Sequence, residues 1–126
     1  MKVAIPSLLT LVFFLAACSG PSDGDVAKAR QQLQAGDPQT AIVVLKAHLA
    51  DNPDAAESRF LLGTAFAAIG NANGAEVELR RAKSLKFADH EVLPALAKVM
   101  LARGQHKALI EEFAGIVLTE KSAMAD

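Results

Sequence analysis

The chain repeats itself with a fixed period. Gly36, Gly70 and Gly104 are spaced 34 residues apart, and the residues around them repeat as well. A period of about 20 to 50 residues is typical of arrays in which each unit packs only against its neighbours. The sequence therefore predicts three stacked units, preceded by an N-terminal segment of different character.

Each unit holds two segments in which apolar residues recur at intervals of three and four, as on one face of an α-helix. The first segments cover residues 26–35, 60–69 and 93–103. The second segments carry these apolar stripes: Ala41, Ile42, Leu45 and Leu49; Ala75, Leu79 and Ala82; Leu109 and Phe113. Since glycine accepts the left-handed conformation that ends many helices, each unit is predicted to be a helix-turn-helix hairpin.

Polar residues mark where helices begin and end. Asp37 and Asn71 follow two of the glycines and are predicted to cap the next helix, with Pro38 in its first turn. Asn52 precedes a proline, which disfavours helical geometry and predicts a turn between the first two units. The later joint has no proline, and there Asp89 is predicted to cap the third unit's first helix.

The interior must be built from small and aliphatic side chains, since the chain has 52% hydrophobic residues but no Trp or Tyr. Small residues should let the helices approach closely, and larger ones should fill the remaining space. The small set is Ala29, Ala41, Gly63, Ala75 and Ala97; the large set is Leu45, Phe66, Leu79, Met100 and Phe113.

This order of small and large residues resembles the tetratricopeptide repeat, whose unit is 34 residues long. The matching positions are Leu62, Gly63, Phe66, Gly70, Ala75, Leu79 and Ala82 in the second unit; Leu96, Ala97, Met100, Gly104, Leu109 and Phe113 in the third; Ala29, Gly36, Ala41, Leu45 and Pro53 in the first. Departures are Lys28, His48 and Leu109. The resemblance implies an all-α, right-handed superhelix with repeats at 23–55, 56–89 and 90–116 and a tail at 117–126.

The N-terminal segment resembles the leader of bacterial lipoproteins. Lys2 precedes an apolar stretch that ends in Leu15-Ala16-Ala17-Cys18, like a lipobox. The resemblance implies a signal peptide at 1–17, cleavage before Cys18, acyl chains on that residue as a membrane anchor, and a tether at 18–22. The alternatives are an ordinary secretory signal or an uncleaved membrane helix, for which the apolar run is short.

Little in the sequence indicates chemistry. His48, His90 and His106 have no metal-ligand spacing, and no phosphate loop or nucleophile elbow is present, so we expect no metal, no cofactor and no enzyme. Without Lys2, 12 basic residues stand against 14 acidic ones, a formal charge of −2, which gives no reason to expect nucleic acid as a partner.

Two charged groups have a structural interpretation. Glu111 and Glu112 are expected on a solvated helix face. A basic cluster, Arg80, Arg81, Lys83 and Lys86, follows Glu76 by a helical turn and lies near a helix end, where cations are favoured. Its alternative is a docking patch for an acidic partner or a polysaccharide.

Function is expected on the concave face, which the first helices line in tetratricopeptide arrays. The predicted partner-binding residues are Val26, Arg30, Leu33, Glu57, Phe60, Thr64, Ala67, Glu91, Pro94, Lys98 and Leu101. The Lys and Asn pattern with which some such repeats clamp a terminal carboxylate is absent.

A second resemblance concerns the system in which the chain works. Residues 59–63, 75–82 and 91–97 look like the beginning of the tetratricopeptide lipoproteins of the PEP-CTERM/exosortase system, whose members have many more repeats. This chain would then be a fragment or a truncated version, and the apolar run at 114–118 would fold back as an imperfect cap or leave an exposed apolar edge.

That resemblance implies a protein-binding scaffold linked to PEP-CTERM sorting and exopolysaccharide export. Ser19, where Asp would favour the inner membrane, indicates anchoring to the outer membrane, facing the periplasm. The alternatives are a structural lipoprotein of outer-membrane or secretin assembly and a carbohydrate-binding accessory subunit, against which the lack of Trp and Tyr argues.

Overall fold

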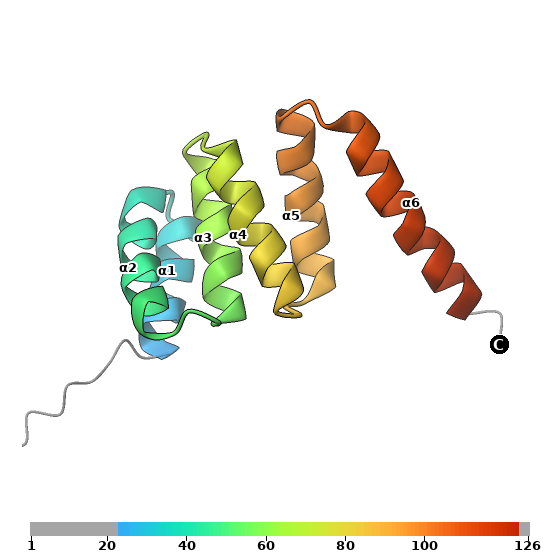
Figure 1. The fold of residues 1–126 in the computed structure, drawn as a ribbon. Helices are drawn as coiled ribbons and strands as arrows, with labels where there is room; N and C mark the ends of the chain where they lie inside the picture. The colour runs from blue at the N-terminus through green and yellow to red at the C-terminus, as the bar shows by residue number, and fades with distance from the viewer. Residues whose placement is uncertain (1–22, 124–126) are drawn as a thin grey trace, which may run out of the picture.

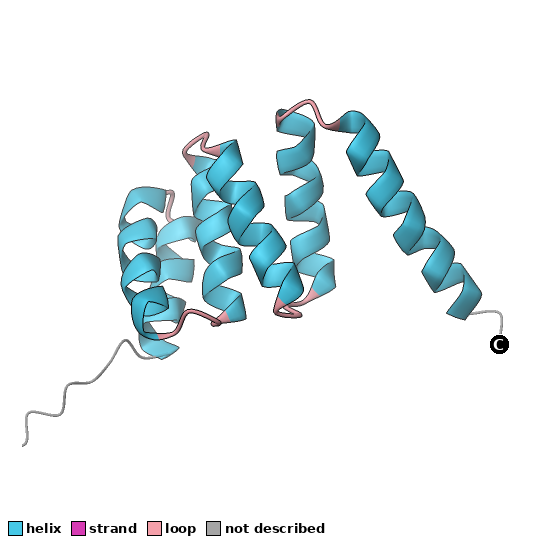
Figure 2. Cartoon of the chain, in the orientation of Figure 1, coloured by secondary structure: helices cyan, strands magenta, loops and turns pink. Residues whose placement is uncertain are grey.

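The computed structural model describes residues 23–123, which form six α-helices and no strand (Figure 2). The all-α fold predicted from the repeat is confirmed. The helices are α1 (Asp23–Gln34), α2 (Pro38–Asp51), α3 (Ala56–Ala68), α4 (Ala72–Ser84), α5 (Asp89–Ala102) and α6 (His106–Ala123).

The helices pair into three consecutive hairpins that stand side by side (Figure 1). In this view α2 and α4 lie in front of α1 and α3, so the first two hairpins form two layers. The hairpins are joined through contacts of α2 with α3 and of α4 with α5, while α1, α3 and α5 contact one another in turn. First helices therefore share one side of the stack, as the repeat predicts.

The three glycines end the first helix of each hairpin in the left-handed conformation. Their φ values are +79°, +79° and +71° for Gly36, Gly70 and Gly104. In each turn the residue that follows the glycine donates its N–H back to a helix carbonyl, for example Asp37 N to Gln32 O at 2.9 Å. This closing bond occupies a carbonyl that the helix end would leave free.

The turn after α4 uses the same geometry without glycine. Lys86 has a φ of +61°, and the N–H of Phe87 donates to the Ala82 carbonyl at 3.0 Å. A side chain in this conformation is strained by roughly 1 to 2 kcal/mol. The sequence did not predict this turn, because lysine carries no signal for it.

The predicted caps are confirmed at two helices out of three. The Asp37 carboxylate accepts the Thr40 N–H at 3.2 Å. Hydrogen bonds with the Thr40 side chain and with this backbone N–H lower the pKa of Asp37. Asn71 caps α4 in the same way. The prediction for Asp89 was wrong: α5 begins at Asp89 itself, after Ala88, which offers no side-chain cap. Asp89 lies in the first turn, where a negative charge suits the helix dipole.

Close packing in the second hairpin depends on Gly63. A Cβ placed there would lie 2.7 Å from Leu79 Cγ and 3.1 Å from the Ala75 carbonyl oxygen. Both Leu79 and Ala75 are fully buried. The predicted role of small residues, to let α3 and α4 approach, is therefore confirmed here.

The third hairpin is more open, and α6 diverges from α5 (Figure 1). At the positions of Gly63 and Ala75 this hairpin carries Ala97 and Leu109, one repeat later. Leu109 is larger than the alanines at this place in the first two hairpins, Ala41 and Ala75, and a larger side chain here disfavours close approach of the helices. The helix α6 runs on through residues 114–118, so that segment does not fold back as a separate cap.

Candidate functional site

A groove lies on the side of the stack that the first helices share. It has a volume of about 680 Å³, and residues of α3, α4 and α5 form its walls. The lining residues are Phe60, Thr64, Ala67, Ala68, Gly70, Ala72, Leu79, Pro94, Ala95, Lys98, Val99 and Ala102. Most of them are apolar and small, because they lie where neighbouring helices come together.

The structure brings five of the predicted partner-binding residues into this groove: Phe60, Thr64, Ala67, Pro94 and Lys98. Phe60 forms part of the floor, where its ring stacks on Phe87 with a centroid distance of 4.9 Å. The Thr64 hydroxyl donates to the Phe60 carbonyl at 3.0 Å, which leaves its lone pairs as acceptors. The groove thus offers a mainly apolar surface with few polar atoms.

Pro94 and Lys98 give the α5 wall its character. Pro94 lies inside the helix and lacks the N–H that would donate to the carbonyl of His90. Lys98 is exposed and makes no ion pair with any residue between 23 and 116. It is the only charged residue among those that line the groove.

Three further predicted residues contact one another beside the groove, where Glu57 and Glu91 lie about one helical turn N-terminal to Phe60 and Pro94. The Arg30 guanidinium lies 2.9 Å from a Glu57 carboxylate oxygen and 3.7 Å from one of Glu91, so it bridges α1, α3 and α5. All three side chains are between one third and one half exposed. Two carboxylates against one guanidinium leave this end of the concave face with a net negative charge.

The other predicted residues lie elsewhere. Val26 is only 8% exposed and belongs to the hydrophobic core, and together with Arg30 and Glu57 it lines a separate pocket of about 360 Å³. Leu33 is half-buried and packs against the same core. Leu101 is 48% exposed but does not line the groove. Cys18 lies outside the described residues.

Sequence reasoning missed seven of the lining residues: Ala68, Gly70, Ala72, Leu79, Ala95, Val99 and Ala102. It assigned Leu79 to packing and Gly70 to the end of a helix. Their signal was the run of small residues at the end of the second unit's first helix and the start of its second. Small side chains there serve both helix packing and the shape of the groove.

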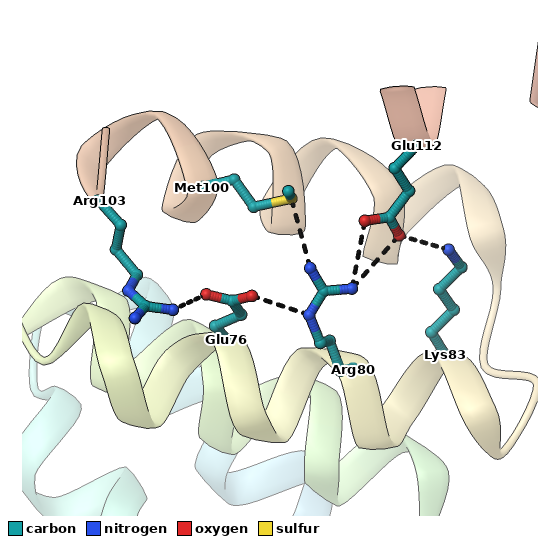
Figure 3. Close-up of polar contacts among 6 residues, drawn as sticks. All are labelled: Glu76, Arg80, Lys83, Met100, Arg103 and Glu112. Carbon is teal, nitrogen blue, oxygen red and sulfur yellow. Dashed lines mark hydrogen bonds and ion pairs between the residues drawn. The ribbon is translucent and has the colours of Figure 1, made fainter. Parts of the chain in front are cut away.

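The predicted basic cluster is largely neutralised within the fold. Figure 3 shows Arg80 between two carboxylates, that of Glu76 at 2.8 Å and that of Glu112 at 3.2 Å. Lys83 also contacts Glu112, at 2.8 Å, and Arg81 pairs with Asp54. The explanation by the pair of Glu76 and Arg80 is therefore confirmed, and three of the four cations have acidic partners.

Glu112 corrects a prediction, since it does not lie on a solvated face. It joins α6 to the end of α4 through Lys83 and Arg80 (Figure 3). Burial raises the pKa of Glu112, but the hydrogen bond from Lys83 and the charge of Arg80 outweigh burial and lower the pKa below its ordinary value. Glu76, which is 8% exposed, extends this network to Arg103 on the other side.

The histidines show no catalytic or metal arrangement in the described part of the chain. His48 is buried between α2 and α3, and its Nδ1 lies 2.9 Å from the Ser58 hydroxyl. His90 and His106 are exposed. Residues 23–123 hold no group of three or more metal-ligating side chains, and no helix there is long and apolar enough to cross a membrane.

Comparison with known proteins identifies the repeat. The family model described as tetratricopeptide repeat matches residues 32–99, which is more than half of the chain. Comparisons with curated proteins and with solved structures find no match. The period, the three glycine turns, the stacked hairpins and the family match lead to one conclusion: the chain belongs to the tetratricopeptide repeat family.

Proposed function

We propose that this protein is a lipid-anchored scaffold of the bacterial cell envelope that binds a protein partner in the groove between α3 and α5. Tetratricopeptide repeats generally mediate interactions between proteins and are typically non-catalytic. The groove carries the proposal, because its volume of about 680 Å³ and its mainly apolar lining are those of a binding site.

Two features support the anchor: the leader sequence, and the short stretch of chain between Cys18 and the first helix. Cys18 follows Leu15-Ala16-Ala17, and α1 begins at Asp23. Five steps of extended chain span at most about 18 Å. Acyl chains on Cys18 would therefore hold the repeats close to the membrane surface, facing the periplasm if Ser19 directs the protein to the outer membrane.

The proposed setting is PEP-CTERM sorting and exopolysaccharide export. Its support is the resemblance of residues 59–63, 75–82 and 91–97 to lipoproteins of that system. A carbohydrate ligand is less favoured by the groove, since sugars stack on exposed aromatic rings. The one ring that lines it, that of Phe60, is buried against Phe87.

Site-specific photo-crosslinking tests the groove. A photoreactive amino acid at Ala67 lies on the groove wall, whereas one at Val77, also exposed but outside the groove, is the matched control. In cells of the native host, Ala67 should give a protein adduct that Val77 does not. Absence of an adduct at Ala67, or equal adducts at both positions, would contradict binding in the groove.

Metabolic labelling with an alkyne analogue of palmitate tests the anchor. The wild-type chain should be labelled and remain with the membrane fraction, whereas Cys18→Ser should lose both the label and the membrane association. Labelling that survives Cys18→Ser would refute lipidation at this residue.

Deletion of the gene in its host tests the setting. We expect impaired processing of PEP-CTERM proteins or reduced exopolysaccharide at the cell surface, restored by the wild-type gene. Normal levels of both would remove this part of the proposal. An adduct at Ala67 with a secretin subunit would instead favour the alternative role in secretin assembly.

A further inference from the structure

The concave face has opposite charges at its two ends, and this sets what the groove can bind. One end carries Arg30 with Glu57 and Glu91, a cluster with net negative charge. The other end carries Lys98, which has no ion pair with the residues between 23 and 116. The lining between them is mainly apolar.

The spacing of these charges is fixed by one helix. Glu91, Pro94 and Lys98 follow one another along α5 at intervals of three and four, so they lie on the same face. Seven residues at a rise of about 1.5 Å separate Glu91 from Lys98 by about 10 Å along the helix axis. An extended chain covers this distance in about three residues.

We propose that the groove selects an extended segment of a partner protein in which a basic and an acidic residue flank two apolar residues. This inference rests on the proposed function of the same groove. The acidic side chain contacts Lys98 and the basic one contacts Glu91 and Glu57. Because side chains alternate along an extended chain, one of the two apolar side chains lies over the Phe60 floor. The charges that this recognition requires, those of Lys98 and of Glu57 and Glu91, are present at the two ends of the groove.

The charges act mainly on selection and not on total affinity. Exposed ion pairs contribute little, and each correct pair should change the dissociation constant by no more than about fivefold. A like charge opposite Lys98 or Glu91 should weaken binding by a similar factor, because both charged groups lose water without gaining an opposite charge. Apolar contact therefore supplies the affinity and the two charged ends supply the discrimination.

Four fluorescein-labelled peptides test the proposal by fluorescence anisotropy at low ionic strength, where exposed charges are screened least. They share Gly-Ser flanks and carry Lys-Leu-Val-Glu, Lys-Leu-Val-Lys, Glu-Leu-Val-Glu or Ser-Leu-Val-Ser at the centre. The wild-type protein should bind the first peptide about fivefold tighter than either like-charged peptide. The uncharged peptide should bind about as weakly as the like-charged ones, because in those one correct pair is offset by one like-charge contact.

Charge reversal of Lys98 supplies the decisive comparison. Lys98→Glu should weaken the Lys-Leu-Val-Glu peptide and strengthen the Lys-Leu-Val-Lys peptide, so that their order reverses. Lys28→Glu makes the same change in net charge at an exposed position of α1 that does not line the groove, and should leave the order unchanged. Circular dichroism checks that both variants remain folded.

The outcomes separate this inference from the proposed function. Equal binding of all four peptides, or an order that Lys98→Glu does not reverse, would overturn the charge selection. If Ala67 still crosslinks a protein partner in that case, the groove remains a binding site with a different specificity. If neither the peptides nor a partner engages the groove, both proposals fail.

Discussion

Gly63 and Gly115 each lie inside a helix, and replacing each by alanine should change stability in opposite directions. Gly63 in α3 faces α4, where an added Cβ would lie 2.7 Å from Leu79 Cγ, 3.0 Å from Leu79 Cδ2 and 3.1 Å from the Ala75 carbonyl oxygen. Carbon atoms prefer a separation of about 3.5 to 4.0 Å. Gly115 in α6 has no atom within 4 Å of an added Cβ.

The magnitudes follow from two opposing terms. Alanine is better than glycine inside a helix by about 1 kcal/mol, and this gain applies at both positions. At Gly63 the clash adds a cost of about 1 to 3 kcal/mol, since Leu79 is fully buried and one contacting atom is backbone. Gly63→Ala should therefore lower the free energy of unfolding by about 1 kcal/mol, and Gly115→Ala should raise it.

Urea unfolding followed by circular dichroism at 222 nm measures both effects, with thermal melting as a second readout. A loss of 1 kcal/mol corresponds to a melting temperature lower by about 4 to 8 °C in a domain of this size. If Gly63→Ala were as stabilising as Gly115→Ala, the close approach of α3 and α4 would not be what Gly63 provides. Ala75→Leu at the same contact should destabilise further, with an altered melting curve.

Three other changes test separate features of the fold. Lys86→Gly should raise the free energy of unfolding by about 1 kcal/mol, because glycine removes the strain of the left-handed turn; an unchanged urea midpoint would contradict this. Ser58→Ala should cost about 1 to 3 kcal/mol by leaving the buried His48 ring nitrogen without its partner, and thermal melting would show a smaller loss if water replaced the hydroxyl. The pKa of Glu112 is lowered in the folded state, so its contribution is present above the unfolded pKa and lost as pH falls through the folded one. The protection factors of the α6 amides, which compare the exchange rate with the intrinsic rate at the same pH, should therefore fall at acidic pH, and Glu112→Gln should remove that dependence.

The sequence predicted the fold well because its strongest signals are periodic. Gly36 and the two glycines one and two repeats later determine where the first helices end, and the stripes of apolar residues determine which faces are buried. What it missed has a local cause. Lys86 adopts glycine-like geometry since the closing hydrogen bond of Phe87 stabilises that turn, and Asp89 enters the helix instead of capping it.

The site was harder to predict, because a helical stripe does not say which neighbour covers each residue. Val26 and Phe60 occupy equivalent places one repeat apart, yet only Phe60 forms part of the groove floor, whereas Val26 lines a different pocket. The role of Glu112 depends on where α6 places this side chain relative to Lys83 and Arg80 of α4. That placement has no direct sequence signal, because Glu112 lies about 30 positions from both of them in the chain.

The position of the groove also follows from side-chain volume at one repeat position. Ala67 and Ala68 line the groove between α3 and α5, and one repeat earlier the same places hold Leu33 and Gln34. Leu33 packs against the core, so the equivalent space beside α1 is filled by a side chain. Ala67→Leu should therefore fill the groove as Leu33 fills the first unit, weakening peptide binding while the melting temperature stays close to that of the wild type. Full retention of peptide affinity in this variant would show that the bound segment lies elsewhere on the repeats.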